Sequence, residues 1–305
     1  MADINRTTNS MALPSDVASE ILQGVQSESA IMRLARKITL PGRGVTIPVI
    51  TSDPSAQWVE ETGLKPVSNA TPATKLMQAH KIAVIETFSK EFVRDIPALY
   101  DALVKRLPGA LAAVFDSTVI GANATELANF DKLSACTAQS ILNANNGTYL
   151  GLVAADTDIA NHNGILNGFA LSAQARGLLL TAVDGNGRPL FLSSANEGVV
   201  DRVLGAPAYF SKSVYKAGTA AVGTDAGTPA IVGIAGDWSQ AMYGTVSGVE
   251  ISVNDSASLT VGSGGSATTI NLWQQNMVAV RAEIEVGFRA NTAAFNLLTG
   301  AVPLS

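Results

Sequence analysis

The residue types that most often perform chemistry are scarce in this sequence and poorly spaced for it. The two histidines, His80 and His162, lie far apart, and neither has a second ligand at the spacing of a metal site. Asp156 and Asp158 could hold a cation together, but they lie in a stretch rich in turn-forming residues, where solvated carboxylates are common. Cys136 is the single cysteine and has no evident base to activate its thiol. We therefore predict no metal site and no reactive cysteine.

Three further patterns could belong to an enzyme, and each is incomplete. The adjacent Glu60 and Glu61 would work as an acid–base site only if another carboxylate came close. Residues 185–187 lack the third glycine and the strand-to-helix setting of a dinucleotide-binding loop. Ser247 and Gly248 do not complete a nucleophile elbow. The sequence therefore predicts no catalytic residue, no cofactor and no enzymatic activity.

The composition indicates a protein that buries much of its surface against partners. Of 305 residues, 47% are hydrophobic and only 15% are charged, and a monomer with so little charge would be poorly soluble. The net charge of −5 argues against a surface that binds nucleic acid by neutralising phosphates. The sequence shows no signal-peptide pattern and no apolar run long enough to span a bilayer. We expect the protein to be made and kept in a cytosol.

The longest periodic segment predicts a helix over residues 95–121, about 40 Å long at ~1.5 Å per residue. Its apolar residues recur at steps of three and four, which is typical of a helix that lies on a broad surface. We expect Asp95 to be the N-cap and Gly121 to supply the stop. Pro108 should kink the helix, because it removes one backbone hydrogen bond. The rest of the chain, or a neighbouring subunit, must provide the surface.

A long projecting loop between two strands is predicted within residues 45–88. The loop is rich in Ser, Pro, Asn and Thr, yet it carries the large apolar side chains of Trp58 and Val59. Two strands alone make no core, so we expect these side chains to pack on an adjacent subunit. The polar rim of that contact would consist of Glu60, Glu61 and Lys65. The competing interpretation is a disordered insertion, against which the two apolar residues argue.

The N-terminal part is expected to hold a polar arm over residues 1–13 and then a helix. The helical stripe covers residues 15–35, with a break near residues 27–29. Basic side chains gather at its C-terminal end, where the helix dipole favours them. These are Arg33, Arg36 and Lys37.

The elements that follow the long helix are predicted from periodicity and turn signals. We expect helices over residues 126–145 and 169–183, and a turn-rich connection over residues 152–163. The second helix would be capped by Ser172 or entered from Asn167 and Gly168. The chain is then β-rich over residues 206–266. Two strands are predicted as well, a short one over residues 190–192 and a long one over residues 277–288, where apolar and polar residues alternate.

Six segments, in the same order, resemble signatures of the major capsid proteins of tailed double-stranded DNA bacteriophages, which share the Hong Kong 97 fold. The first resembles the loop motif of that family, with an alanine before Trp58 and Val59 and a proline after the glutamates. The others resemble the step into the long helix, three later signatures, and the closing strand with the tail. The segments are residues 56–66, 87–95, 184–190, 204–207, 236–239, and 278–283 with 294–295. The resemblance covers about residues 15–300.

The resemblance implies an α+β capsid fold of the Hong Kong 97 type, built from an N-terminal arm, an extended β-hairpin loop, a peripheral domain and an axial domain. Residues 1–44 would be the N-terminal arm and helix, and residues 45–92 the extended loop. The peripheral domain with its long spine helix would take residues 93–129 and return over residues 246–305. The axial domain would take residues 130–245.

The function implied is that of a structural subunit that assembles, as hexamers and pentamers, into an icosahedral shell around the phage DNA. Expected partners are further copies of the chain, a portal protein, separate scaffolding or decoration proteins, and packaged double-stranded DNA bound without sequence specificity. The basic side chains of the first helix could touch that DNA if the helix lines the interior. We expect no membrane partner and no cofactor. The expected location is the virion capsid, after assembly in the cytoplasm of the bacterial host.

Two other functions stay open from the sequence. The shell of a bacterial encapsulin-like nanocompartment would have the same fold and would enclose an enzyme in place of a genome. A glycine-rich α+β enzyme could work through backbone groups and water. The contents of native particles separate the first two functions, and a catalytic dyad in the structure would support the third. One branch of the resembled family cross-links its subunits from a loop lysine to a distant asparagine. No glutamate lies close enough in the tail to assist that reaction, so we predict that Lys65 forms no such bond with Asn291 or Asn296.

Overall fold

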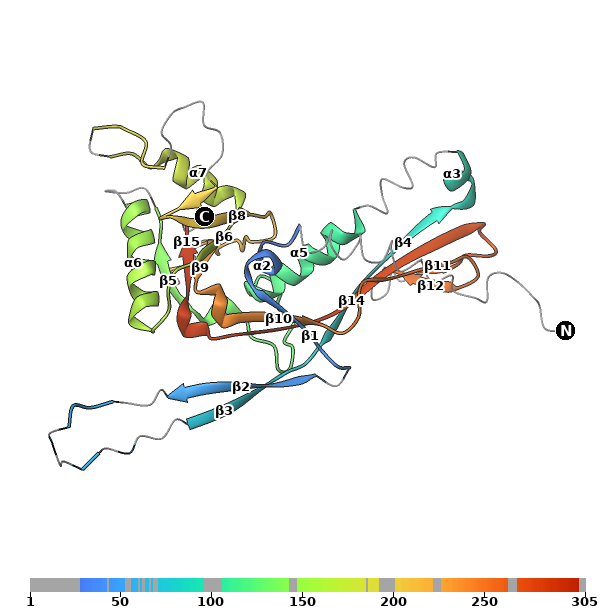
Figure 1. The fold of residues 1–305 in the computed structure, drawn as a ribbon. Coiled ribbons are helices and arrows are strands. Elements are labelled where there is room, and N and C mark those ends of the chain that lie inside the picture. The colour runs from blue at the N-terminus through green and yellow to red at the C-terminus, as the bar shows by residue number, and fades with distance from the viewer. Residues whose placement is uncertain are drawn as a thin grey trace.

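In the computed structural model, the subunit has an elongated body with two sheets and a two-stranded arm that projects from it (Figure 1). The structure describes residues 28–42, 44–52, 56–59, 61, 64–65, 67, 71–95, 106–142, 147–184, 186–191, 201–221, 226–262 and 268–301. The expected polar arm over residues 1–13 lies outside this part of the chain.

A five-stranded sheet runs along the body. Its central strand β14 (Met277–Ala290) pairs on one edge with β4 (His80–Ser89) and on the other with β11 (Glu250–Asn254) and β10 (Ala241–Thr245). The short β1 (Arg36–Thr39) adds in parallel to β10. The alternating pattern over residues 277–288 thus correctly predicted a long strand.

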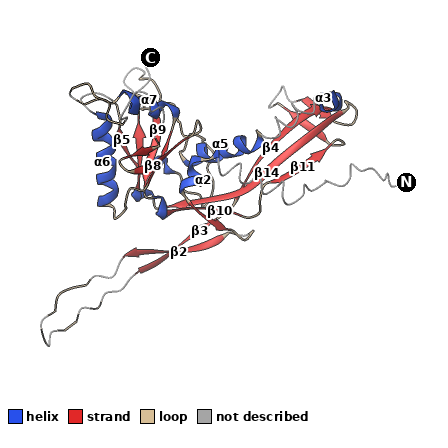
Figure 2. Ribbon diagram, turned by 45° about the horizontal axis from the view of Figure 1, so that its top comes forward, coloured by secondary structure: helices blue, strands red, loops and turns tan. Residues whose placement is uncertain are grey.

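A six-stranded sheet forms the second unit of the body. Its strand order is β5 (Thr137–Ser140), β15 (Phe295–Thr299), β9 (Ile231–Gly236), β6 (Gly168–Leu171), β8 (Ala206–Phe210) and β7 (Arg202–Val203). Strands β6, β9 and β15 are buried at every residue, as expected for the centre of a covered sheet. Helix α6 (Gly147–Asn161) packs against β5, β15 and β9, and helix α7 (Ala173–Thr181) packs against β9. Figure 2 shows the two helices beside this sheet.

Several smaller elements connect the strands of the two sheets. They are the hairpin of β12 (Ser258–Val261) and β13 (Thr268–Asn271), and three 3-10 helices: η1 (Leu133–Ala135), η3 (Trp238–Gln240) and η5 (Thr292–Ala294). Within the part that the structure describes, no helix is long and apolar enough to cross a membrane.

The long helix predicted over residues 95–121 is only partly present in the described chain. Asp95 belongs to the short helix α3 (Lys90–Asp95), so its assignment as an N-cap was wrong. Helix α5 (Leu107–Val119) carries Pro108 in its first turn, where the missing N–H loses no helical hydrogen bond. Pro108 therefore lies in the first turn of a described helix. The predicted kink depends also on residues 96–105, which lie outside the described residues, and stays a prediction. The stop is confirmed: Gly121 has φ of +72°, which favours glycine after a helix.

Helix α5 lies on the five-stranded sheet through aromatic contacts. Phe115 meets Phe130 and Phe288 edge-on, with ring centroids 6.4 and 6.1 Å apart. All three rings belong to the largest apolar cluster of the body, and Phe115 and Phe288 are fully buried there. Edge-on packing of this kind adds to the stabilisation from area burial alone.

Two predictions for the chain that follows α5 were wrong. Residues 126–142 form a loop, η1 and β5 where a helix was predicted, and Asn129 has φ of +56°, which no α-helix contains. Conversely, most of residues 152–163, predicted as a turn-rich connection, belongs to α6.

The helix predicted over residues 169–183 begins too early. Its first residues form β6, and α7 follows Ser172, whose side chain accepts a hydrogen bond from the backbone N of Ala175. Ser172 is therefore the predicted cap. Of the strand predicted over residues 190–192, Leu190 and Phe191 are described, and neither lies in a strand.

The N-terminal helix is interrupted where the sequence predicted. Ser29 is extended and caps helix α2 (Ala30–Leu34) by accepting a hydrogen bond from the backbone N of Met32. The helix ends at Leu34, earlier than expected, because the chain enters β1 and pairs with β10. Arg36 and Lys37 are thus strand residues, and only Arg33 lies in the last helical turn.

Candidate inter-subunit surface

The arm consists of β2 (Val45–Ser52) and β3 (Thr71–Met77), which pair antiparallel with each other and with no other described strand. Figures 1 and 2 show it extending away from both sheets. The two strands predicted within residues 45–88 are therefore present, but the second is divided. Gln78 and Ala79 separate β3, which belongs to the arm, from β4, which belongs to the body.

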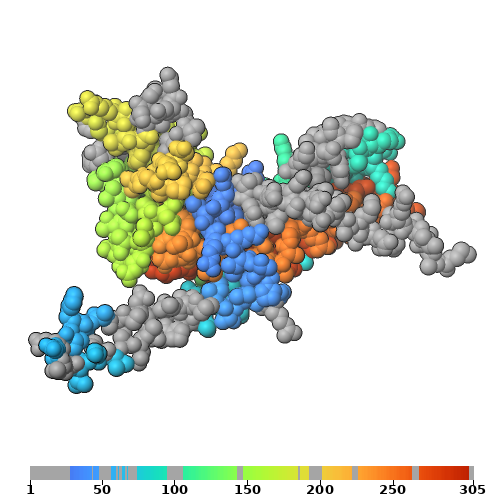
Figure 3. All heavy atoms as spheres, viewed as in Figure 1, coloured from blue at the N-terminus to red at the C-terminus, as the bar shows by residue number. Residues whose placement is uncertain are grey.

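The described apolar side chains at the tip of the arm face solvent in a single subunit. Trp58 is fully exposed, and Leu64 and Val67 expose 99% and 90% of their surface. In Figure 3 the atoms of the tip stand clear of the body. Large apolar side chains exposed together on one projecting loop are typical of a site of protein contact, and a lone two-stranded arm has no core to bury them.

The structure describes four of the five residues predicted to make the inter-subunit contact. Trp58, Val59, Glu61 and Lys65 all lie between β2 and β3 and are exposed. Glu60 lies outside the described residues. Sequence reasoning overlooked Leu64 and Val67, although both are apolar residues inside the same polar segment.

The root of the arm is held to the body by Arg289, on β14. Its Nε and Nη2 both donate to the carbonyl oxygen of Leu76 on β3, at 2.8 and 2.6 Å. Its Nη1 donates to Asp131 Oδ1 at 2.6 Å, and Nη2 also donates to Asn129 Oδ1 at 3.0 Å. Asp131 is itself fixed to β14, because Oδ2 accepts from the backbone N of Ala290 at 3.1 Å. The guanidinium thus joins the arm, the loop before η1 and the long strand.

Weaker contacts surround this joint. Lys75 Nζ donates to the carbonyl oxygen of Ala290 at 3.4 Å, and Asn129 Nδ2 donates to Gln78 Oε1 at 3.4 Å. His80 Nε2 lies 2.7 Å from the carbonyl oxygen of Ala128. Sequence reasoning missed the joint, because its members lie up to 215 positions apart and no local pattern connects them.

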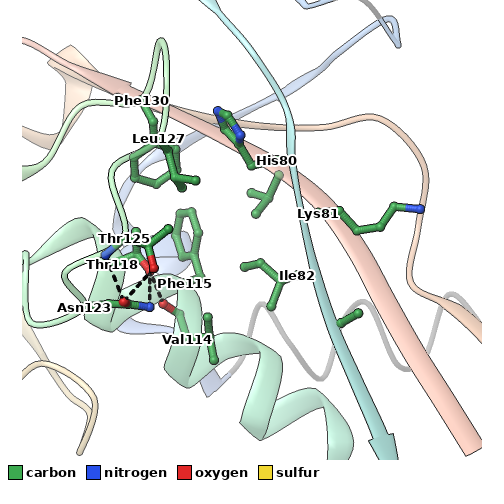
Figure 4. A pocket seen from close by; sticks show the side chains of 12 residues that line it. His80, Lys81, Ile82, Val114, Phe115, Thr118, Asn123, Thr125, Leu127 and Phe130 are labelled. Carbon is green, nitrogen blue, oxygen red and sulfur yellow. Dashed lines mark hydrogen bonds between the residues drawn. The ribbon is translucent and has the colours of Figure 1, made fainter. Parts of the chain in front are cut away.

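A cavity of about 270 Å³ opens beside the root (Figure 4). It lies between β4, α5 and the loop that follows α5, and most of its lining side chains are apolar. Its polar contacts are structural: Asn123 Oδ1 accepts from the backbone N and Oγ1 of Thr125. Lys81 at its edge pairs with Glu283, whose hydrogen bond and charge raise the pKa of the lysine. Among the described residues that line the cavity, no nucleophile is hydrogen-bonded to a base.

The other candidate reactive groups are inert or dispersed. Burial raises the pKa of the Cys136 thiol to about 12, so the nucleophilic thiolate is scarce. His162 follows α6 directly, and its Nδ1 lies 2.8 Å from the carbonyl oxygen of Asp158 in that helix, far along the chain from His80. Among the described residues, no three His, Cys, Asp or Glu gather as a metal site would require. The arm tip and its root are therefore the surface that calls for a functional explanation.

Comparison with known proteins gives one consistent result. A family model described as the phage capsid family matches residues 9–300. The probable major capsid protein gp17 of Mycobacterium phage D29 is 30% identical over 308 residues, which cover 95% of this chain and 90% of that protein. Its counterpart in Mycobacterium phage L5 is 28% identical over 299 residues, covering 92% and 86%.

Solved structures agree on the fold. A chain from Mycobacterium phage Ogopogo superposes with a TM-score of 0.71 at 20% identity, covering 90% of this chain and 92% of that one. A chain from Gordonia phage Cozz superposes with a TM-score of 0.68 at 24% identity, covering 90% and 87%.

Proposed function

This chain belongs to the phage capsid family and is a non-enzymatic structural subunit of a capsid shell, and we propose that its β2–β3 arm is the clasp between neighbouring subunits. One observation carries the proposal: Trp58, the largest apolar side chain of the tip, is fully exposed at the end of an arm that cannot bury it. Large aromatic residues dominate protein interfaces. A second subunit is the surface that a shell always provides.

The polar residues of the tip fit the rim of such a contact. Glu61 and Lys65 are exposed in the same segment as Trp58, and Val59 is exposed as well. A charged rim around a buried aromatic centre is the usual arrangement of an interface. Glu60 is proposed for the same rim from the sequence alone.

The arm makes the contact heterologous, because the tip of one subunit meets a different surface on the next. Such contacts close into rings only when the rotation between subunits is right. We therefore propose the Hong Kong 97 arrangement, in which the subunit forms both hexamers and pentamers.

The domains of that arrangement can be proposed for the two sheets. The five-stranded sheet with α5 would be the peripheral domain, and the six-stranded sheet with α6 and α7 the axial domain. Four strands cross the boundaries expected from the sequence. β1, inside the expected arm range, and β4, inside the expected loop range, both pair in the five-stranded sheet. β10, inside the expected axial range, pairs in the five-stranded sheet, and β15, inside the expected peripheral return, pairs in the six-stranded sheet. The proposed division assigns each strand to the sheet in which it pairs.

Packaged double-stranded DNA, a portal and separate scaffolding or decoration proteins are proposed as further partners, with assembly in the cytoplasm of the host. The net charge of −5 favours containment of DNA by the closed shell over tight binding. Arg33 and Arg36 are exposed and could make scattered phosphate contacts.

Light scattering and electron microscopy of the purified full-length protein test the proposal. We expect megadalton closed particles, with Trp58→Ala greatly reducing their yield. A strictly monomeric 31.5 kDa species under every condition, including in virions, would contradict shell formation. Native particles that hold an enzyme in place of DNA would identify a nanocompartment.

A further inference from the structure

We propose that Arg289 is the positioning residue that fixes the angle between the arm and the body, and thereby the size of the shell. The inference rests on the proposed function of the arm as a clasp. It goes further, because it places the control of curvature in a joint far from the contacting tip.

The contacts of Arg289 support a rigid joint. Two of its nitrogens donate to one backbone oxygen of the arm, that of Leu76, while a third pairs with Asp131 of the body. A guanidinium is planar, so these directions are fixed relative to one another. The side chains of Arg289 and Asp131 expose only 14% and 18% of their surface, so water screens the pair weakly.

The backbone around the joint is tightly packed as well. A Cβ atom on Gly287 would lie 2.6 Å from the carbonyl oxygen of Gln78, closer than real Cβ atoms come. Met77, the last residue of β3, is fully buried. The chain therefore leaves the arm through a narrow passage beside β14, with Arg289 two positions beyond Gly287.

A small rotation at this joint has a large effect at the tip. The eight residues of β2 span about 27 Å at ~3.4 Å per residue. A turn of roughly 10° at the root moves the far end of such a strand by about 5 Å, more than the ~4.5 Å reach of an apolar contact. Rings of five and six subunits differ by about 12° in the rotation between neighbours. A loose joint would therefore admit rings and shells of the wrong size.

The variant Arg289→Lys tests the contact of Arg289 with the arm separately from its contact with the body. A lysine keeps the charge and can still pair with Asp131, but its single ammonium cannot replace the fork that holds Leu76. The matched control is Arg281→Lys, on the same strand, where Arg281 lies 3.6 Å from Glu283 and has no contact with the arm among its described partners. A milder second variant is Gln78→Ala, which removes only the bond from Asn129.

The experiment compares full-length shells of the wild type and the three variants. Particle diameters are measured by electron microscopy, and amide hydrogen exchange is measured over β3 and over the β4–β14 ladder. For Arg289→Lys we expect about tenfold faster exchange in β3, as for the loss of one or two hydrogen bonds. We also expect a broad spread of diameters and unchanged exchange in the ladder. Gln78→Ala should shift both readouts in the same direction by less, and Arg281→Lys should match the wild type.

Three results would overturn the proposal. One is a single wild-type diameter for Arg289→Lys, whether or not exchange in β3 accelerates. Another is a spread of particle diameters for Arg281→Lys as broad as that for Arg289→Lys. The third applies if Arg289→Lys forms no particles. In that case, Gln78→Ala shells with uniform diameters and wild-type hydrogen exchange in β3 would overturn the proposal. Failure of the clasp itself is distinguishable, because Trp58→Ala would then assemble normally.

Discussion

The hydroxyl of Ser29 donates a hydrogen bond to Asp116 Oδ1 across 87 positions of the chain. Both residues are fully buried, Ser29 as the cap of α2 and Asp116 on α5. The other carboxylate oxygen accepts from the backbone N of Ala30 and from Ser213 Oγ, both at 3.1 Å. Asp116 thus ties together α2, α5 and the loop after β8, with hydrogen bonds and no cation among its described partners.

We predict that Asp116 makes the subunit less stable as the pH rises from about 4 to 7. Burial, only partly offset by the hydrogen bonds, raises the pKa of this carboxyl from 3.8 to about 6. The folded state therefore holds its proton where the unfolded state has lost it, and the stabilisation disappears as the pH passes the folded pKa. The effect on the free energy of unfolding is up to about 3 kcal/mol. Thermal melts between pH 4 and pH 8 measure it.

Asp116→Asn is the test variant, because the amide keeps the shape of the carboxyl and cannot ionise. As the pH rises from 4 to 8, the free energy of unfolding of the wild type should fall relative to that of Asp116→Asn. Asp156→Asn removes an exposed carboxylate from α6 and serves as the control, with a melting profile parallel to that of the wild type. Parallel profiles for wild type and Asp116→Asn would refute the prediction.

Boiled particles should give a single band at the mass of the monomer, 31.5 kDa, on a denaturing gel. Asn296 is fully buried, with Nδ2 donating to Asp158 Oδ2 at 2.9 Å, so it cannot meet the exposed Lys65 of another subunit. Asn291 is exposed, but its amide donates to Gln240 Oε1 at 2.8 Å. Particles treated with a chemical cross-linker provide the positive control. A ladder from untreated particles would show that cross-links form.

Two glycines in helices provide another test. Glycine is required at Gly151 of α6, because a Cβ atom there would collide with the carbonyl oxygen of Ser140. Gly151→Ala should therefore destabilise the subunit by about 1–3 kcal/mol. Gly177, exposed on α7 with nothing within 4 Å of a Cβ, is the matched control, and Gly177→Ala should stabilise by ~0.4–1 kcal/mol. Thermal melts that fail to separate the two variants would contradict this account.

Local patterns predicted elements that carry their own periodicity or caps. The alternation over residues 277–288 predicted β14, and Ser172 and Gly121 marked the beginning of α7 and the end of α5. Non-local pairing decided the elements that were wrong. Residues 137–140 become β5 because they pair in parallel with β15, more than 150 positions away. No local propensity reports such a partner.

The same distinction applies to the candidate surface. The sequence predicts Trp58 as a contact residue, because a large aromatic in a long polar loop has nothing local to pack on. The exposure of this side chain fits the prediction, and the contact itself stays a prediction. The joint could not be predicted, because Arg289 is one more basic residue in a strand until Leu76 and Asp131 are brought beside it. Contacts that fix the direction of an element are tertiary, whereas an apolar residue without a local partner can be recognised in the sequence of the element itself.

Trp58→Ala should leave the subunit folded but weaken shell formation. The side chain is fully exposed in the single subunit, so its removal costs the fold little. At an interface, truncating a central tryptophan costs about 2 kcal/mol or more per contact, and the loss recurs at every copy in the shell. A circular dichroism melt beside a particle count by electron microscopy measures both effects. Trp58→Phe, which keeps a large aromatic ring, should assemble close to the wild-type level. Assembly of Trp58→Ala at wild-type yield and stability would remove the clasp assignment, and failure to fold would place Trp58 in the core of its own subunit.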